Sequence, residues 1–584
     1  MSETWITDSP ASEKYPNYTR ANAGEVMPDP VSPLSASVGL GGAGEQGWRD
    51  AYVRFGAFDY DEFEPDRLNT IGIFGGYLYL NMSLTRIYGV RMPGLTPEIV
   101  DFQYFGDMPG IVPYEKEARP TDESPKHGVL LQQYVAELFA REDFPELRDD
   151  RDAIGRLVAR RPDLGEMTDQ ELVDQARSHL PVFRRLFCRH IQMSGASGIG
   201  IGTVAQVLAA VGRPELVMTL VAGLGDVDSA LPSLALWDLG RVVRSSTALT
   251  AVFDAGLVGL AERLKAAAEA GDNDAAEFDW RFAQFLRDHG SRGPNEWEFR
   301  SHTWGTNPDL PLAAVDRMRF AADADSPSAR GDVRVTERHA ATAEVRALLA
   351  GNDEALATFD AGLRVALLTN AGRERTKTNN IRVVHEVRLP LRELGRRMVE
   401  RGVLDNIEQV FMLVDTELDL FTEQPAELSA RVREREAFYL SLWEREPPFV
   451  TFGAPPPVDQ WPLRSAASGP TAVVGTALSG IPGCPGVARG RARVVLDPAD
   501  PRGLEPGDVL IAPYTDPSWT PLFVTAAAVV VDVGAQITHA VIVSRELGLP
   551  CVVSVTGATR TIPDGALVEV DGTAGTVTVI ELPA

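Results

Sequence analysis

Lysine is scarce in this chain: among its 584 residues only Lys14, Lys116, Lys126, Lys265 and Lys377 occur. Arginine therefore supplies most of the positive charge, and the formal net charge is -26. Nucleic acids and anionic membranes both bind basic surfaces, so this charge argues against either as a partner. Phosphate chemistry would instead need a local basic pocket within an acidic protein.

Cysteines and targeting signals are few as well. Cys188, Cys484 and Cys551 are odd in number and far apart, which excludes a disulfide framework or a zinc pattern, so each is expected to be a small buried apolar residue. The first ten residues lack the basic and apolar regions of a signal peptide. We expect no uncharged apolar stretch that approaches the length of roughly 20 residues needed to span a bilayer. The default expectation is a cytoplasmic protein.

The length of the chain predicts two to four domains. Residues 1–125 are rich in Pro, Gly and aromatic residues and predict loops and short strands, with one helical stretch near Gly75 to Tyr88. Residues 130–443 show mostly the periodicity of amphipathic helices, and a Pro-rich and then Ala/Ser-rich linker follows at 451–475. We therefore predict a multidomain protein: a mainly α-helical body over residues 1–450 and a small swivelling α/β domain over 476–584.

The most informative residue is His539. A valine-rich run from Ala526 to Val531 predicts a buried strand, and apolar residues at helical spacing from His539 to Leu547 predict a helix that ends at Gly548. An imidazole at a helix N-terminus lies where free N–H groups and the helix dipole favour an anion, as a phosphoryl carrier requires. Spacing alone also fits a helix cap or a half-buried filler.

Motifs around this histidine resemble a known family. They are Gly480 to Gly490, Leu504 to Leu510, the loop before His539, Asp564-Gly565 and Val570 to Gly575. Together they resemble the mobile phosphohistidine domain of the phosphoenolpyruvate-utilising enzymes. The resemblance implies that His539 is phosphorylated and passes the phosphoryl group on.

The resemblance has departures in the loop itself. Ala535 stands where a second glycine is usual, and Ile537 stands where threonine is usual. Thr538 replaces the usual serine and keeps a hydroxyl that can contact the phosphate. The phosphate contacts are therefore expected to differ in detail from those of the family.

Weaker motifs in the helical body resemble the acceptor-binding domain of rifampicin phosphotransferase-like proteins. They include Thr19 to Leu34, Gly75 to Asn81, Asp288 to Glu296 and Arg373 to Lys377. Glu25 and Asn22, in the opening motif, are by this resemblance expected to face the acceptor; ordinary polar loop contacts are the alternative.

Arg373 and Lys377 would share one face of a helix, where two positive charges repel unless an anion lies between them. Such charges stabilise a phosphoryl group in transfer, and Glu374 could orient the acceptor hydroxyl or take its proton. In similar phosphotransferases an Arg-Glu-x-x-Lys segment lies near the arriving phosphohistidine. An exposed helix with ordinary ion pairs is the alternative.

Arg292 and Glu296 lie among glycines and proline, so with His289 they are predicted to form a loop. The resemblance implies that Arg292 contacts phosphate or substrate, with Glu296 nearby. A structural salt bridge explains the pair nearly as well.

Members of the family carry an ATP-grasp domain that charges the histidine, and no such domain or Walker A sequence is found in this chain. The expected partner is therefore a separate ATP-grasp subunit that supplies ATP and Mg²⁺, as in aryl phosphate synthases; no metal is predicted in the chain itself. The expected function is phosphoryl transfer from His539 to a hydroxyl of a small, phenolic or aromatic, acceptor. A ligase that activates a carboxylate and a non-catalytic binding subunit are the alternatives.

Overall fold

The computed structural model describes residues 5–105, 111–115, 120–224, 228, 230–323, 326–464, 471–498, 503–534 and 538–583. The chain forms two compact units. Unit 1 contains Met1–Ile199, Trp297–Arg300 and Leu368–Ser468, and unit 2 contains Gly200–Glu296, Ser301–Leu367 and Gly469–Ala584. Each unit is thus assembled from separate stretches of sequence.

This grouping differs from a single helical body followed by a small domain. Residues 476–584 fall wholly within unit 2, but they share it with residues 200–296 and 301–367 of the predicted body. Residues 465–470 of the predicted linker lie outside the described residues. The α/β character of the C-terminal region is confirmed, whereas the predicted boundaries at 450 and 475 stay a prediction.

Unit 1 contains a four-stranded antiparallel sheet in the order β2-β3-β1-β4. The strands are β1 (Asn17–Thr19), β2 (Ile71–Phe74), β3 (Tyr77–Asn81) and β4 (Val450–Phe452). Gly75 and Gly76 both have positive φ and join β2 to β3 in a two-residue hairpin, as such turns require. The predicted helix near Gly75 was therefore wrong at its start: α3 (Met82–Arg91) begins after β3, where the Asn81 side chain accepts from Leu84 N.

Unit 1 also contains a series of shorter helices. They are α1 (Ala23–Val26), α2 (Glu45–Phe55), α4 (Pro97–Phe105), α5 (Pro125–Ala140), α6 (Pro145–Ala159), α7 (Asp169–Ser178), α17 (Leu418–Glu423) and α18 (Pro425–Leu442). Two longer helices, α8 (Leu180–Ala210) and α16 (Asp353–Glu400), belong partly to each unit. Both helices are longer than the sequence pattern predicts, and Pro390, which is expected near a helix start, lies inside α16.

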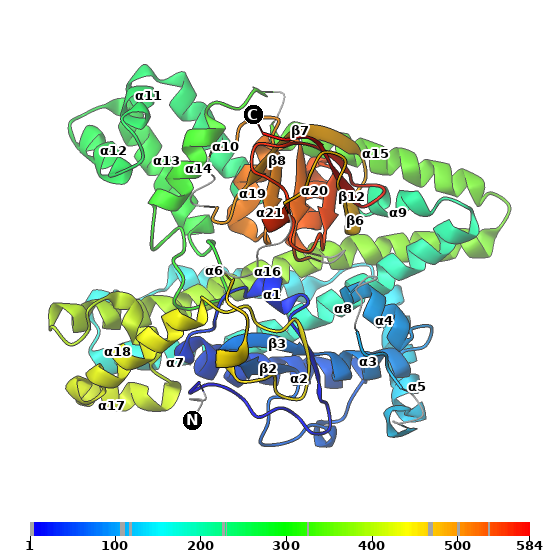
Figure 1. Ribbon diagram of the computed structural model, residues 1–584, viewed down its shortest axis with the longest axis horizontal. Coiled ribbons are helices and arrows are strands. Elements are labelled where there is room, and N and C mark those ends of the chain that lie inside the picture. The colour runs from blue at the N-terminus through cyan, green and yellow to red at the C-terminus, as the bar shows by residue number, and fades with distance from the viewer. Residues whose placement is uncertain are drawn as a thin grey trace. The chain divides into compact units, whose positions relative to one another are not determined.

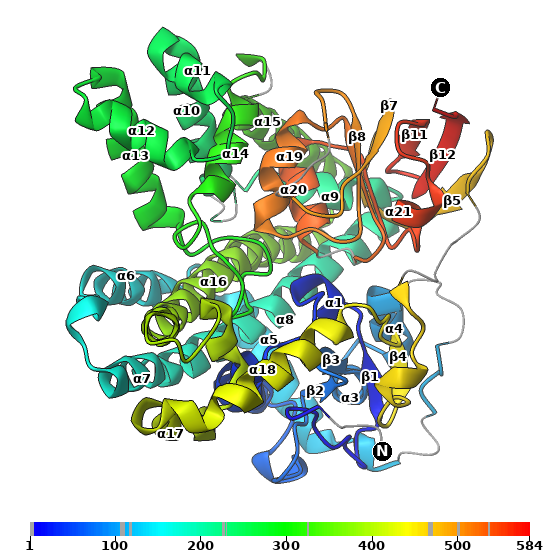
Figure 2. The same ribbon diagram turned by 60° about the vertical axis from the view of Figure 1, so that its left-hand side comes forward.

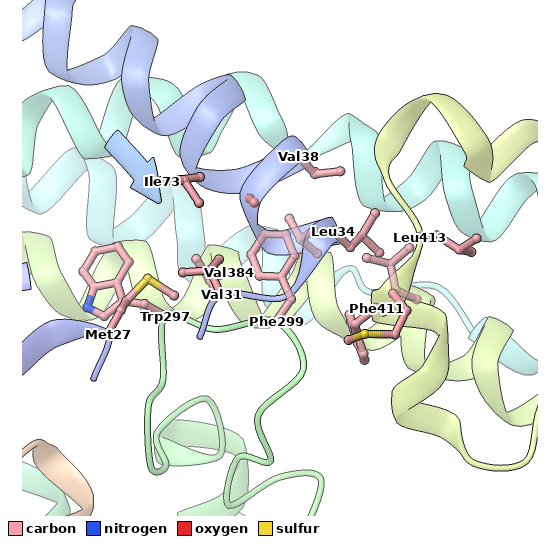
Figure 3. Packing of buried hydrophobic residues seen from close by; sticks show 14 of the residues in the cluster. Met27, Val31, Leu34, Val38, Ile73, Trp297, Phe299, Val384, Phe411 and Leu413 are labelled. Atoms are coloured by element: carbon pink, nitrogen blue, oxygen red, sulfur yellow. The ribbon is translucent and has the colours of Figure 1, made fainter. Parts of the chain in front are cut away.

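The core of unit 1 joins segments that are far apart in sequence. Figure 3 shows Trp297 and Phe299 beside Val31 and Leu34 of the opening segment and Val384 of α16. The backbone of the short 297–300 stretch is fixed by Arg388, whose guanidinium donates to Phe299 O at 3.0 Å and to Glu298 O at 2.8 Å. This contact explains why four residues from the middle of the chain belong to unit 1.

Unit 2 contains an eight-stranded sheet in the order β5-β12-β11-β7-β8-β9-β10-β6. Its strands are β5 (Ala477–Ser479), β6 (Ile481–Cys484), β7 (Val487–Val494), β8 (Val509–Ala512), β9 (Ala528–Val531), β10 (Cys551–Val553), β11 (Leu567–Asp571) and β12 (Thr576–Glu581). The pairs β7–β8, β8–β9 and β9–β10 are parallel, and the outer pairs are antiparallel.

Helices cover both faces of the parallel strands (Figure 2). Leu510, Val529 and Val531 pack against α19 (Thr520–Thr525) and α20 (His539–Leu547). The alternate residues, Ile511 and Val530 among them, pack against α21 (Ala558–Thr561). Because both faces are buried, these strands read as continuous apolar runs rather than alternating ones.

The remaining helices of unit 2 lie mostly in two groups. One, drawn in green in Figure 1, consists of α10 (Leu231–Ser245), α11 (Thr247–Asp254), α12 (Leu260–Glu269), α13 (Asn273–His289) and α14 (Asp309–Met318). The other joins α15 (Pro327–Leu348) and α9 (Val217–Leu220) to the ends of α8 and α16 that belong to this unit. The three cysteines are free and buried, as expected.

Within the part of the chain that the structure describes, one helical stretch, Asp169–Ala210, is long and apolar enough to cross a membrane by length and composition, which corrects the expectation that none approaches this length. A single such helix is weak evidence, since core helices pass the same test. In this stretch Leu186 packs into the core of unit 1, and Leu208 packs with Val345 in unit 2.

Candidate functional site

The local fold around His539 is the one that its sequence predicts. β9 ends at Val531, α20 begins at His539 with Thr538 as its N-cap residue, and β10 follows. Gly548 ends the helix with φ 68°, the left-handed conformation typical of a glycine cap. Ala535, Gln536 and Ile537 lie outside the described residues, so the predicted departures at 535 and 537 stay a prediction.

Two threonine hydroxyls hold the imidazole. Thr515 Oγ1 lies 3.1 Å from His539 Nδ1, and Thr520 Oγ1 lies 3.2 Å from Nε2. The Phe523 ring packs edge-on at a centroid distance of 5.9 Å. Thr515 follows β8 and Thr520 begins α19, so the site lies beyond the carboxyl ends of parallel strands, where ligands bind in such sheets.

His539 is buried, with 6% of its surface exposed. A ring nitrogen needs a free lone pair to attack phosphorus, and each nitrogen faces a threonine hydroxyl. Phosphorylation therefore requires one of these two hydrogen bonds to break. In return, a hydroxyl that stays on the other nitrogen fixes the orientation of the ring.

Asp516, next to Thr515, links the segment after β8 to the turn region between α13 and α14 of the same unit. Its Oδ2 accepts from Asn295 N at 2.9 Å, and its Oδ1 accepts from Ser518 N at 2.8 Å. Burial raises the pKa of Asp516 to about 6, and the nearby Glu296 carboxylate adds to the increase. Asn295 has φ 48°, a left-handed conformation that asparagine tolerates better than most residues.

The predicted residues Arg292 and Glu296 therefore lie in the same unit as His539. Arg292 Nη1 pairs with Glu296 Oε1 at 3.0 Å and Oε2 at 3.2 Å, and the side chains are 2% and 1% exposed. His289 is not a loop residue as predicted, because it is the last residue of α13. The pair accounts for a structural role of Arg292, and its contact with substrate or phosphate stays a prediction.

Arg373, Glu374 and Lys377 lie on α16 in unit 1. At about 100° per residue, they fall with Asn370 within roughly 100° of one helix face. Farther along α16, the same face carries the fully buried Ile381. On this face of α16, polar and charged residues therefore occupy positions like those at which the helix buries apolar residues farther along.

Glu374 and Arg373 are also unusual because neither forms an ion pair among the described residues. Glu374 is 6% exposed, yet within the described residues it makes no hydrogen bond or ion pair. The Arg373 side chain is half-buried, and it forms no ion pair with an acidic residue among those that the structure describes. A buried carboxylate without a partner among the described residues is costly for folding alone, and the ligand-binding role of this motif stays a prediction.

A histidine that the sequence analysis did not single out lies beside this motif. His190 on α8 has Nδ1 3.1 Å from Thr376 Oγ1, and its ring packs 6.0 Å from Trp297. Burial and then the charges of Arg373 and Lys377 lower the pKa of His190 to about 3. Its position on the buried face of α8, three residues after Phe187, could have drawn attention to it.

The opening segment forms a short helix rather than the expected loop. Asn22 precedes α1 with φ 63°, and Glu25 lies within α1 and is buried. Arg20, which the sequence analysis missed, donates to Leu78 O at 2.7 Å and to Pro28 O at 2.9 Å. These bonds fix the turn that carries Asn22 and Glu25, whose contact with an acceptor stays a prediction.

One cluster among the described residues could hold a cation: Asp59, Glu62 and His127. Cationic side chains already neutralise it, because Arg91 Nη2 lies 2.6 Å from Glu62 Oε1 and Lys126 Nζ lies 2.5 Å from Asp59 Oδ2. The donor set therefore fits a network of ion pairs better than a metal site.

Comparison with known families matches two parts of the chain. Residues 189–374 match the description "Rifampicin phosphotransferase fourth domain", and residues 504–575 match "PEP-utilising enzyme, mobile domain". The first range contains His190, Arg292 and Glu374, and the second contains Thr515 and His539.

Three relatives illustrate the extent of the similarity. An uncharacterised protein of Mycobacterium tuberculosis is 30% identical over 98% of this chain and 63% of its own length. Prodigiosin synthesizing transferase PigC of Serratia marcescens is 27% identical over 71% of this chain and 46% of its own length. Rifampicin phosphotransferase of Streptomyces sviceus is 37% identical over 32% of this chain and 21% of its own length.

The chain thus spans 63% or less of the length of each of these relatives. The match that contains His539 and the match that runs from α8 to α16 both indicate the phosphoenolpyruvate-utilising enzymes. Together they show a chain that is similar to rifampicin phosphotransferase and that carries the mobile domain of the phosphoenolpyruvate-utilising enzymes.

Proposed function

We propose that this chain is a phosphotransferase that carries a phosphoryl group on His539 and delivers it to a hydroxyl of a small organic acceptor, with phenolic or aromatic compounds as the expected class. The observation that carries the proposal is the position of His539 as the first residue of α20, with a hydroxyl at each ring nitrogen. The helix N-terminus stabilises the negative charge of a phosphoryl group bound to that ring.

Two displacements at phosphorus describe the reaction. In the first, a lone pair of the His539 ring forms an N–P bond as a P–O bond of the donor breaks. In the second, the acceptor oxygen forms a P–O bond as the N–P bond breaks, and the hydroxyl proton passes to Glu374. Arg373 and Lys377 stabilise the charge on the transferring group. The second step requires the predicted swivelling of residues 476–584.

Charging is assigned to an ATP-grasp module that uses ATP and Mg²⁺, supplied by a separate subunit. ATP and its metal would bind to that module, and this chain would offer only the ring nitrogen of His539. The predicted departures in the histidine loop leave the hydroxyl of Thr538 as the loop's own contact to the phosphate.

The experiment mixes the purified chain with a candidate ATP-grasp protein and labelled ATP, then screens phenols and alcohols for new phosphate esters. Label should appear on His539 as an acid-labile, base-stable adduct. His539→Ala should abolish both labelling and transfer, while His339→Ala, which changes an exposed histidine on α15, should leave both unchanged. Full transfer by His539→Ala would overturn the proposal.

A second candidate is a condensing enzyme that activates a carboxylate through phosphohistidine. It is favoured by one finding: the match to a transferase named for prodigiosin synthesis covers 71% of this chain, whereas the match to rifampicin phosphotransferase covers 32%. Product analysis separates the two candidates, because transfer leaves a stable phosphate ester and condensation leaves a coupled product with free phosphate. A non-catalytic binding subunit, the third alternative, would never label His539.

A further inference from the structure

The interface between α8 and α16 in unit 1 carries a row of polar contacts. Ser197 Oγ donates to Asn370 Oδ1 at 2.8 Å, His190 Nδ1 lies 3.1 Å from Thr376 Oγ1, and Asn380 Nδ2 donates to Leu186 O at 3.1 Å. As the residue numbers rise on one helix they fall on the other, so the two helices run antiparallel along this row. Polar groups in such a row fix which residues of the two helices face one another.

The hydrogen bonds of Thr376 determine which nitrogen of His190 carries the proton. The Thr376 hydroxyl has one hydrogen, which it donates to Arg373 O at 2.9 Å. Toward His190 the hydroxyl can therefore only accept, so Nδ1 must be the protonated nitrogen. The ring also hydrogen-bonds to the Arg373 backbone carbonyl, which can accept only from the protonated nitrogen, so in a neutral ring Nε2 is left with a bare lone pair.

The ring also stays neutral at physiological pH. Burial and the positive charges of Arg373 and Lys377 lower the pKa of His190 to about 3, as described above. The side chain is only partly covered by its neighbours. A neutral imidazole with an open Nε2 is a hydrogen-bond acceptor, and it is held beside the two cations assigned to the phosphoryl group.

Asn370 provides a second, independent observation. It lies one turn before Glu374 on the same face of α16, it is 6% exposed, and its Nδ2 has no hydrogen-bond partner among the described residues. Turning the amide over would satisfy Nδ2 through Ser197 but would leave Oδ1 without a partner instead. Either way, one buried polar atom lacks a partner, which is costly unless a ligand or water supplies one.

We propose that His190 and Asn370 bind the acceptor: Nε2 of His190 accepts a hydrogen bond from the reacting hydroxyl, and the amide of Asn370 bonds to a second polar group of the same molecule. This inference rests on the proposed function and narrows its substrate class. A bare lone pair selects a group that carries a proton, so the acceptor presents an O–H group and not an ionised carboxylate. His190 is too weak a base to keep this proton, so as the P–O bond forms the proton passes from its hydrogen bond with Nε2 to the carboxylate of Glu374, which lies on the same helix as Asn370.

The first test uses nuclear magnetic resonance and needs no phosphorylation. In full-length chain labelled with ¹⁵N-histidine, the signals of His190, assigned by their loss in His190→Gln, should show a protonated Nδ1 and a bare Nε2 at pH 7. Phenol as the probe should shift Nε2, whereas benzoate should not. A proton on Nε2, or a shift with benzoate but not with phenol, would overturn the inference.

The second test separates the two half-reactions. In His190→Gln and Asn370→Leu, charging of His539 should proceed at the wild-type rate, while discharge of the phosphohistidine to phenol should fall about tenfold in kcat/KM, as the loss of one hydrogen bond implies. The matched control is His339→Gln on α15. Discharge at the wild-type rate in both variants would refute the role of the two residues. Absence of label on wild-type His539 would instead count against the proposed function, and the resonance test would still stand.

Discussion

Among the Arg–Glu pairs that are four residues apart, two differ strongly in burial, which allows a sharp prediction. Arg292 and Glu296 are 2% and 1% exposed, while Arg281 and Glu277 on α13 are 44% and 56% exposed. Both pairs are four residues apart and both belong to unit 2. Comparing them therefore measures what a buried setting, together with the further contacts of Arg292 and Glu296, adds to an ion pair.

Breaking the buried pair leaves one charge without its main partner in a low-dielectric environment. Arg292→Met or Glu296→Gln should each lower the free energy of unfolding by about 3–5 kcal/mol. Glu277→Gln should cost less than about 0.5 kcal/mol, because water already solvates both groups. The double variant Arg292→Met/Glu296→Leu should recover most of the loss, since it removes both charges.

Thermal unfolding followed by calorimetry measures these differences, with the transition of unit 2 falling on the order of 10 °C in each single variant of the buried pair. Activity is then measured on the double variant, in which stability is restored. If Arg292 also contacts the phosphoryl group, transfer should remain slow there although the protein is folded. Single variants no less stable than Glu277→Gln would refute the reasoning from burial.

Three further predictions follow from the site and its support. Thr520→Val should change the rate of His539 charging in rapid-quench assays by less than about tenfold, because it removes a single neutral hydrogen bond; complete loss would show that this hydroxyl is essential to the chemistry. In the folded protein the pKa of Asp516 is raised from 3.8 to about 6, so the native state holds a proton that the unfolded state has lost, and the contribution of Asp516 to stability falls as pH rises from about 4 to about 6. Asp516→Asn should flatten that part of the profile of stability against pH, measured by urea titration. An unchanged profile would contradict the raised pKa. Gly548→Ala should destabilise unit 2 by about 1 kcal/mol or more, because φ is 68° and a Cβ would lie 2.8 Å from the Arg334 guanidinium. The control Gly331→Ala, on α15 with no neighbouring atom near its Cβ, should stabilise unit 2 in the same denaturation assay. Equal effects of the two substitutions would argue against the left-handed cap.

The strand, helix and second strand around His539 could be predicted because each is specified locally. A buried strand of valines, a helical period and a terminal glycine are readable within about ten residues. The residues that hold the ring could not be predicted in this way. Thr515 and Thr520 reach His539 from the end of another strand and from a different helix, and no local pattern marks them.

The same distinction between local and long-range features explains what could and could not be predicted about α16. Helical spacing places Arg373 and Lys377 on one face, which the structure confirms. Their relation to His190 depends on the pairing of α16 with α8, nearly two hundred residues earlier. Helix ends were also predicted too early, since α8 and α16 continue through glycines and a proline that usually interrupt such patterns.

The way in which the chain is shared between the two units limits how its parts can be exchanged. The polypeptide leaves unit 1 within α8, returns for residues 297–300, and returns again within α16. A single crossover between the genes of two relatives would therefore combine fragments of different ancestry inside one hydrophobic core. Recombination that preserves folding must replace several stretches together, so the acceptor-side and histidine-side sequences of this protein are expected to have been inherited as one block.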